Sequence, residues 1–378
     1  DNVTRFVRTG DDIIVDGTSG LVVVNPYPDM LKRYEEKKRH YDDAKDEYLK
    51  YAKLPAQTMD HYQIGIGSNI EFIEEIPSAI THGAEHIGLY RTEFLYIYRD
   101  DLPSEEDHFN NYRQVVTEKN LAWATIRTFD LGGDKFTKYQ KKDKELNPQM
   151  GLRAIRFCLE RTDIFKAQLR AILRASTKGN VKVMFPMISG IDELMRARGI
   201  LGECMDELRK KGRKFDEGIE VGAMIEIPSA ALTADIIAKQ VDFFSIGTND
   251  LIQYSLAVDR VNEKIAYLYE PRHPAILRLI SQIITAGHKE NIWVGMCGEM
   301  AGEPSLALIL LGMGLDEFSV SAVSIPEIKK VIRSVQLADA RALAEDVLGY
   351  TSIEDIRTRC RRLLLKVAPE LVVLKGER

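Results

Sequence analysis

Four arginines occupy positions where their side chains could bind an anion: Arg91, Arg127, Arg153 and Arg260. Arg91 follows a short apolar segment, and Arg127 lies in another. Arg153 begins a helical pattern in a long connection, and Arg260 lies a few residues past a further apolar segment. A guanidinium presents a rigid fork of donors that meets carboxylate or phosphate oxygens two at a time, so several converging arginines predict a small polyanionic ligand. Lys135 adds another positive charge nearby in the sequence. Each residue taken singly is also compatible with an ordinary surface or interface role.

Two carboxylates close similar apolar segments, Glu226 in AMIEIP and Asp250 in SIGTND. Mg²⁺ typically takes one or two protein carboxylates and completes its shell with water and substrate oxygens, so this pair is a candidate Mg²⁺ site. The alternative is that both are buried ion-pair partners of the arginines. Asn249 beside Asp250 could donate a hydrogen bond to a phosphate or enolate oxygen, or could simply form a turn.

Cys297 lies in the segment GMCGE, with a glycine on either side that would let the backbone approach a ligand closely. A thiol near a positive site can act as an acid or base, which makes Cys297 a candidate catalytic residue. The other cysteines lie on helical patterns and are predicted to be small core residues: Cys158, Cys204 and Cys360. The four cysteines are widely spaced and form no CxxC motif, so the sequence predicts neither a disulfide framework nor a zinc site. It predicts instead that the protein lies in a reducing compartment.

The segments that carry these residues recur about every 25 to 40 residues and resemble buried strands. They are 64–69, 86–93, 124–130, 181–187, 221–228, 242–250, 293–299 and 317–321. Helical patterns separate most of them. Eight strands alternating with helices close most simply into a parallel (β/α)8 TIM barrel, whose active site lies at the carboxyl ends of its strands. The sequence therefore predicts an α/β fold and places the candidate residues on one face of it.

Several smaller elements are also expected. Residues 1–25 contain two apolar segments around a Gly-rich turn, which predicts a β-hairpin. Residues 30–52 are dense in charge and predict a long helix, either a connector or a coiled-coil partner. The segment after the first barrel strand predicts a helix with Ser68 or Asn69 as its cap and Gly83 at its end. Beyond residue 336, two further helices are expected to pack outside the barrel.

Composition excludes several classes of function. A net charge of −5 gives no basic excess for binding nucleic acid or an anionic membrane. The sequence has no apolar stretch of about 18 or more residues, so it predicts no membrane-spanning helix. The charged first residues do not form a signal peptide. The 7 histidines show no metal-binding spacing. P-loop, dinucleotide-binding and serine-hydrolase motifs are all missing from the sequence.

At these segments the chain resembles the Enzyme I family of the bacterial phosphoenolpyruvate:sugar phosphotransferase system. The matching strings run through the whole barrel in order: GLYRTEFL, IRTFDLGGDK, NPQMGLRAIR, FPMI, IEIPSA, DFFSIGTNDLIQYSLAVDR, GMCGEMAG and LLGMGLDEFSVS. The string IGTNDLIQYSLAVDR favours Enzyme I over its relatives pyruvate phosphate dikinase and phosphoenolpyruvate synthase.

The resemblance implies a phosphoenolpyruvate-protein phosphotransferase, a cytoplasmic enzyme of sugar uptake that forms a homodimer. Residues 1–28 would be the end of a phosphohistidine domain, 29–56 a linker helix, and 57–378 the phosphoenolpyruvate-binding barrel and dimerisation domain. Mg²⁺ would bind Glu226 and Asp250, and Cys297 would protonate the enolate left when the phosphoryl group departs. The phosphate and carboxylate of the substrate would be held by Arg91, Arg127, Lys135, Arg153, Asn249, Asp250 and Arg260.

One departure from the family pattern bears on function. Enzyme I carries a Gly-Gly-x-Thr-Ser-His string whose histidine accepts the phosphoryl group and passes it to the phosphocarrier protein HPr, and this chain lacks that string. The chain is therefore expected to be a fragment that supplies the phosphoryl donor. The alternatives are the carboxyl half of a dikinase or synthase, and a barrel that binds its ligand without chemistry.

Overall fold

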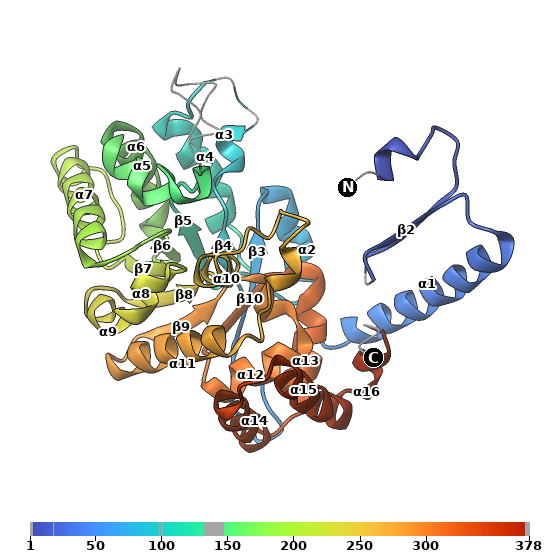
Figure 1. Cartoon of the computed structure of the whole chain (residues 1–378). Coiled ribbons are helices and arrows are strands. Elements are labelled where there is room, and N and C mark those ends of the chain that lie inside the picture. Colours follow the sequence, from blue (N-terminus) through green and yellow to red (C-terminus); the bar gives the residue numbers. More distant parts are fainter. Residues whose placement is uncertain (1–2, 18, 98, 100, 132–146, 375–378) are drawn as a thin grey trace.

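A computed structural model describes residues 3–17, 19–97, 99, 101–131 and 147–374. Its centre is a closed, eight-stranded parallel β-barrel with the strand order β10-β3-β4-β5-β6-β7-β8-β9 (Figure 1). The predicted (β/α)8 fold is confirmed, and every one of the eight predicted segments overlaps a strand. The strands are β3 (Gly65–Ile70), β4 (His86–Tyr90), β5 (Ala124–Arg127), β6 (Val181–Phe185), β7 (Glu220–Ile225), β8 (Phe243–Ile246), β9 (Trp293–Met296) and β10 (Glu317–Ser321).

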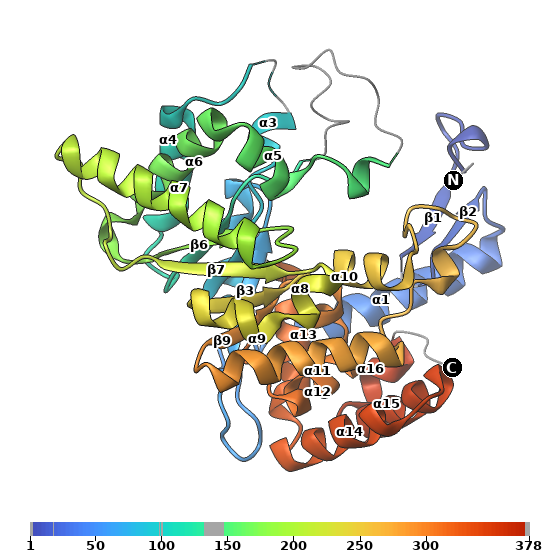
Figure 2. The ribbon, with the colours of Figure 1, turned by 60° about the vertical axis from the view of Figure 1, so that its left-hand side comes forward.

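Helices surround the barrel and follow its strands in the chain, as Figure 2 shows from a second direction. Around the first strands lie α2 (Ile76–Thr81), α3 (Phe94–Ile97), α4 (Glu105–Val116), α5 (Ala154–Glu160), α6 (Thr162–Ala175) and α7 (Ile191–Lys210). The later strands are followed by α8 (Pro228–Leu232), α9 (Ala234–Ile237), α10 (Thr248–Leu256), α11 (Pro274–Lys289), α12 (Pro304–Met313) and α13 (Ile325–Arg333). Ser104 begins α4 with a capping box in which its side chain accepts from the Asp107 N–H.

One predicted boundary is wrong. Ser68 and Asn69 do not cap a helix but continue β3, where they pair with Val320 and Ser321 of β10. The strand continues because its hydrogen-bond ladder with β10 extends to Asn69, and the short helical turn begins only at Ile73. Gly83 ends the helical segment as predicted, with a φ of +91° that favours glycine.

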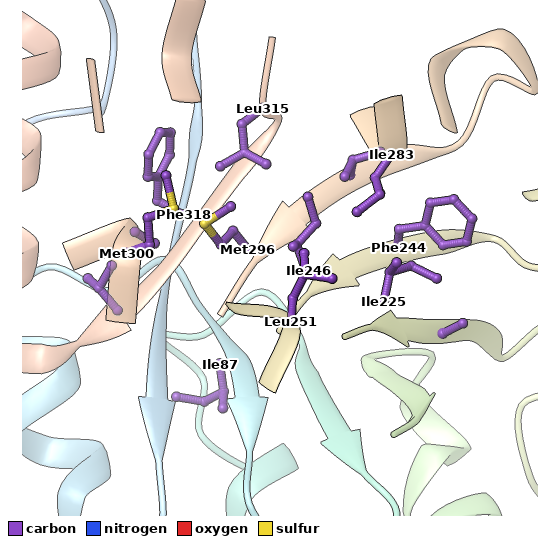
Figure 3. Packing of buried hydrophobic residues seen from close by; sticks show 14 of the residues in the cluster. Ile87, Ile225, Phe244, Ile246, Leu251, Ile283, Met296, Met300, Leu315 and Phe318 are labelled. Atoms are coloured by element: carbon purple, nitrogen blue, oxygen red, sulfur yellow. The ribbon is translucent and has the colours of Figure 1, made fainter. Parts of the chain in front are cut away.

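Large apolar side chains on the outer face of the barrel pack against the helices and form the main core. Figure 3 shows part of this layer, in which Phe244 and Ile246 of β8 cluster with Ile283 of α11. A smaller apolar cluster contains Leu89, Met184, Met224, Phe243 and Cys297, which come from β4, β6, β7, β8 and the end of β9. The two faces of each strand are therefore both buried, as expected for a parallel barrel.

The predicted hairpin and long helix are both present before the barrel. Strands β1 (Ile13–Asp16) and β2 (Leu21–Val24) pair antiparallel, and α1 spans Pro28–Leu49. In Figure 1 this helix projects from the barrel, and the hairpin lies over the half of the helix that is farther from the barrel. A salt bridge between Asp16 and Lys37 joins hairpin to helix. Whether these residues belong to a phosphohistidine domain and its linker stays a prediction.

After the barrel, the described residues up to 374 form the helices α14 (Leu337–Gly349), α15 (Ile353–Val367) and α16 (Pro369–Leu374). Helices α14 and α15 both pack on α12, outside the barrel, as predicted. Within the described part of the chain, none of the helices combines the length and the apolar character that crossing a bilayer requires.

Candidate active site at the carboxyl ends of the strands

Arg127 is the last residue of β5, and its guanidinium is held between two carboxylates. Nη2 lies 2.8 Å from Glu93 Oε1, and Nη1 lies 2.9 Å from Asp130 Oδ2. The side chain is only 11% exposed. Burial alone would lower the pKa of Arg127, but the carboxylates of Glu93 and Asp130 outweigh it and raise that pKa. Arg127 is therefore a permanent, fixed positive charge inside the barrel mouth.

Arg153 immediately precedes α5 and reaches back toward the same point. Its Nη2 lies 2.9 Å from Asp130 Oδ1 and 3.4 Å from Asp250 Oδ2. Its Nη1 donates to Gln149 Oε1 at 2.6 Å. Asp130 thus forms an ion pair with Arg127 through one oxygen and accepts a hydrogen bond from Arg153 with the other. The two arginines, which are distant in sequence, are brought together by a shared carboxylate.

Glu226 and Asp250 share this electrostatic environment. Glu226 directly follows β7, is buried, and accepts from the Met187 N–H at 2.6 Å through Oε1. Burial raises the pKa of Glu226, and the negative charges of Asp250 and Asp130 raise it further. Burial also raises the pKa of Asp250, which lies in the first turn of α10, while Arg153 opposes that shift. Two carboxylates that disfavour each other's charge fit a site that a divalent cation would complete.

Over the described ranges, no three His, Cys, Asp or Glu side chains gather closely enough to hold a metal ion.

Cys297 follows β9, and the residue is 3% exposed. Its side chain packs with Leu89 and Met224, and the sulfur of Met224 lies 3.8 Å from Arg127 Nη1. Burial raises the pKa of the Cys297 thiol to about 11, although the Ser245 hydroxyl and Arg127 offset part of that shift. The thiol is therefore protonated at neutral pH and lies within the electrostatic reach of Arg127.

The remaining predicted residues lie further out. Arg260 Nη1 donates to Glu299 Oε1 at 2.8 Å, and Asn249 Nδ2 donates to the same oxygen at 3.2 Å. The Glu299 N–H in turn donates to Asn249 Oδ1 at 3.0 Å. Arg91 follows β4 and forms an ion pair with Glu71.

Lys135 lies outside the described residues. The other three cysteines are buried, as predicted for core residues.

Three acidic residues of this site were not predicted: Glu93, Asp130 and Glu299. Each belongs to a strand-end segment that the sequence already marks, in RTE, TFD and CGE. The available signal was a carboxylate two or three residues from an arginine or a cysteine in the same segment. Asp130 is the most informative of them, because it organises Arg127 and Arg153 into one unit.

Comparison with known proteins shows which family the sequence of this chain matches. The family model described as PEP-utilising enzyme, PEP-binding domain, matches residues 45–337. Curated relatives named phosphoenolpyruvate-protein phosphotransferase include one from Geobacillus stearothermophilus, 49% identical over 360 residues, which cover 95% of this chain and 62% of that protein. The relative from Haemophilus influenzae is 48% identical, over 96% of this chain and 63% of its own length. That from Bacillus subtilis is 47% identical, over 93% and 62%.

This chain therefore spans a little over three-fifths of the length of these relatives. Among solved structures, a citrate lyase from Burkholderia xenovorans aligns with a TM-score of 0.45 and 12% identity, covering 84% of this chain and 95% of that chain. The family match spans all eight barrel strands and every predicted site residue. On that match, the chain belongs to the family of PEP-utilising enzymes and carries its PEP-binding domain.

Proposed function

We propose that this chain binds phosphoenolpyruvate together with Mg²⁺ and gives up the phosphoryl group to a histidine outside residues 1–378, releasing pyruvate. The observation that carries the proposal is the convergence of Arg127, Arg153, Glu226 and Asp250, all linked through contacts or charge effects with Asp130. The names of the relatives support the same reaction, phosphoryl transfer from phosphoenolpyruvate to a protein.

The proposed role of the arginines is to neutralise and position the substrate's phosphate and carboxylate. Phosphoryl transfer needs little covalent assistance, and catalysis comes mainly from fixed charge and alignment. Arg127 and Arg153 are already held in place by carboxylates, so binding the anion requires little reorganisation of them. Arg91, Arg260 and Asn249 would complete the contacts from the outer part of the site. Lys135, which lies outside the described residues, would be a further contact.

Glu226 and Asp250 would hold Mg²⁺. When bound, the ion would neutralise charge on the phosphoryl oxygens. Burial raises the pKa of both carboxyls, and the charge of Asp130 raises each further, so a bound cation would offset part of the cost of keeping both carboxyls ionised. The first turn of α10, which contains Asp250, also presents N–H groups that have no acceptor within the helix and favour an anion.

Cys297 would supply the proton that converts enolpyruvate to pyruvate. In that step the Sγ–H bond breaks, the electron pair of the enolate double bond forms a new C–H bond at C3, and the thiolate regains a proton from water. The high pKa of the Cys297 thiol, about 11, keeps it in the acid form that this step needs. A barrel that only binds its ligand would not require a protonated thiol beside Arg127.

A binding experiment tests the proposal. Phosphoenolpyruvate is titrated calorimetrically with and without Mg²⁺ against the wild type, Arg127→Gln and Arg209→Gln. Arg209 is the matched control because it forms a surface ion pair with Asp206 and Glu217, away from the site. Loss of a buried charge-assisted bond should weaken binding by about 10- to 100-fold in Arg127→Gln. Binding that is indifferent to both Mg²⁺ and Arg127→Gln would refute the proposal.

The wider setting follows from the same family relation and is also a proposal. The phosphoryl group would reach HPr through the histidine domain, in a cytoplasmic sugar-uptake system. The chain would act as a homodimer, which sedimentation of the purified protein can check. A dikinase or synthase remains the alternative for the whole enzyme, and the names of the relatives favour the phosphotransferase.

A further inference from the structure

The hydrogen-bond ladder beside Cys297 is incomplete on one side. On the β8 side, pairing reaches Ile246 and Met296, and the Cys297 N–H donates to Ile246 O at 3.2 Å. On the β10 side, the pairs between β9 and β10 are Glu317 with Gly295 and Phe318 with Met296, so the ladder ends one residue before Cys297. Over the described residues, no backbone N–H donates to the carbonyl of Cys297, so this carbonyl needs another donor.

Asn69 of β3 supplies that donor. Its Nδ2 donates to Cys297 O at 3.0 Å, although β3 and β9 are not neighbours in the barrel and β10 lies between them. The Ser319 hydroxyl, fully buried on β10, donates to Asn69 Oδ1 at 2.7 Å. Because a carbonyl oxygen can only accept, Nδ2 must face Cys297 and Oδ1 must face Ser319. The Asn69 side chain thus gives the Cys297 carbonyl a hydrogen-bond donor in place of a backbone N–H, and the Ser319 hydroxyl fixes the orientation of the Asn69 amide.

This bond bears on the thiol because it fixes the backbone that carries it. The Cys297 N–H is tied to β8 and its carbonyl is tied to Asn69, so the thiol can move only by rotation of its own side chain. Without Asn69, the carbonyl would be a partly buried acceptor that seeks a new partner, and the residues after β9 would shift to find one. A shift of this kind moves Sγ relative to Arg127 without removing any group that contacts the substrate.

We propose that Asn69 is a positioning residue for the Cys297 thiol and that Ser319 orients the Asn69 amide for this role. The inference rests on the proposed function, in which Cys297 is the acid that protonates enolpyruvate. It assigns to Asn69 no contact with the substrate. Its distinguishing consequence is that loss of Asn69 slows proton transfer at C3 far more than it weakens substrate binding.

Asn180 provides a matched control. It precedes β6, at the opposite end of the barrel, and its Nδ2 donates to Val116 O at 2.8 Å. The same residue type thus makes the same kind of bond to a backbone carbonyl, at a comparable distance, far along the strand from the site. Asn180→Ala measures what losing such a bond does to the barrel as a whole.

The experiment compares wild type, Asn69→Ala, Ser319→Ala and Asn180→Ala, each as the whole 378-residue chain. Deuterium incorporation into the methyl group of pyruvate is followed by NMR in D₂O with Mg²⁺, and phosphoenolpyruvate affinity is measured by calorimetry. In the exchange reaction, the small thiolate fraction of Cys297 takes a proton from C3 of pyruvate, which gives enolpyruvate and a thiol. The thiol exchanges its proton for deuterium from D₂O, and the S–D group then returns deuterium to C3. Thermal melting confirms that each variant is folded.

We expect Asn69→Ala to slow exchange by about 10- to 100-fold, the effect of misplacing a reacting group by roughly 1 Å, with affinity changed by no more than about 3-fold. Ser319→Ala should show the same selectivity to a smaller degree, and it keeps the test valid if Asn69→Ala does not fold. Asn180→Ala should leave exchange and affinity unchanged.

Two results would overturn the inference while leaving the proposed function intact. One is exchange in Asn69→Ala equal to that in Asn180→Ala. The other is an equal loss of exchange and affinity, which would indicate a merely structural role. A wild type that binds phosphoenolpyruvate and exchanges no methyl protons would instead overturn the acid role of Cys297, and the inference with it.

Discussion

Replacing Gly298 with alanine tests whether the two halves of the site must lie in close contact. A Cβ at Gly298 would lie 1.9 Å from Thr248 Oγ1, 2.6 Å from Thr248 N and 2.8 Å from Thr248 Cβ. Rotating the Thr248 side chain relieves only the first contact, because N and Cβ are fixed by the backbone of α10. The φ of Gly298 is −73°, which alanine adopts freely, so the effect is purely one of space.

The size of the effect follows from these distances. Ordinary contact begins near 3.4 Å, so Thr248 N and the new methyl group must separate by roughly 0.8 Å. Thr248 is the first residue of α10 and Gly298 follows Cys297, so this movement displaces Asn249 and Asp250 relative to the thiol. A misplacement of about 1 Å costs up to about 100-fold in rate. Overpacking of this kind also destabilises the fold by about 1–3 kcal/mol.

The assay is methyl-proton exchange of pyruvate together with calorimetric binding of phosphoenolpyruvate and Mg²⁺. Gly298→Ala should lose about 10- to 100-fold in exchange. Gly302→Ala is the matched control, because a Cβ there would meet nothing nearer than 3.8 Å. Exchange and affinity in Gly298→Ala within about 3-fold of those in Gly302→Ala would refute the argument that the close approach of Gly298 to Thr248 holds the site together.

Three further outcomes are expected. Because burial raises the pKa of Cys297 to about 11, protonation of enolpyruvate should be flat between pH 7 and 9, and a midpoint near about 8.5, the value of an ordinary thiol, would contradict this. Glu299 is 73% exposed and accepts from Arg260 and Asn249, so it competes weakly with a substrate anion, and Glu299→Gln should tighten phosphoenolpyruvate binding by about 1.5- to 5-fold in a titration. Weaker binding in that variant would be the contrary result. Burial lowers the pKa of His108 to about 4 in the folded state, whereas in the unfolded state the histidine binds a proton near pH 6.5. The free energy of unfolding should therefore fall by about 3 kcal/mol as the pH drops from about 6.5 to about 4. Urea unfolding at several pH values measures this, and His108→Phe should flatten the slope.

The barrel could be predicted from the sequence because its strands are short apolar segments at regular intervals, and a parallel barrel needs nothing else to be recognised. Strand ends were harder to place. Asn69 and Ser68 have side chains that commonly cap helices, yet they continue β3 because the ladder with β10 holds them there. Pairing with residues of β10, about 250 positions away in the sequence, decides the conformation of Ser68 and Asn69. A pattern of neighbouring residues cannot reveal such a distant partner.

The sequence predicted most of the residues of the candidate site, but it predicted few of the contacts between them. Residue type and position at strand ends selected Arg127, Glu226, Asp250 and Cys297, and the structure brings these residues to one end of the barrel. Asp130 escaped selection because a single aspartate after a strand also reads as a turn residue. Its role depends on Arg153 approaching from a helix that begins 24 residues later, and that approach is a property of the fold.

The position of Cys297 relative to the charged residues explains how one site can hold a neutral acid and ionised carboxylates together. The thiol packs into the apolar cluster with Leu89 and Met224, where a thiolate would lose its hydration without gaining a direct ion pair. Asp130, by contrast, lies between two guanidiniums. Arg127 borders both environments, since it contacts Asp130 on one side and the Met224 sulfur on the other. An enolate formed beside Arg127 would therefore meet a thiol that still holds its proton, because the apolar cluster keeps that thiol neutral until the carbon takes the proton.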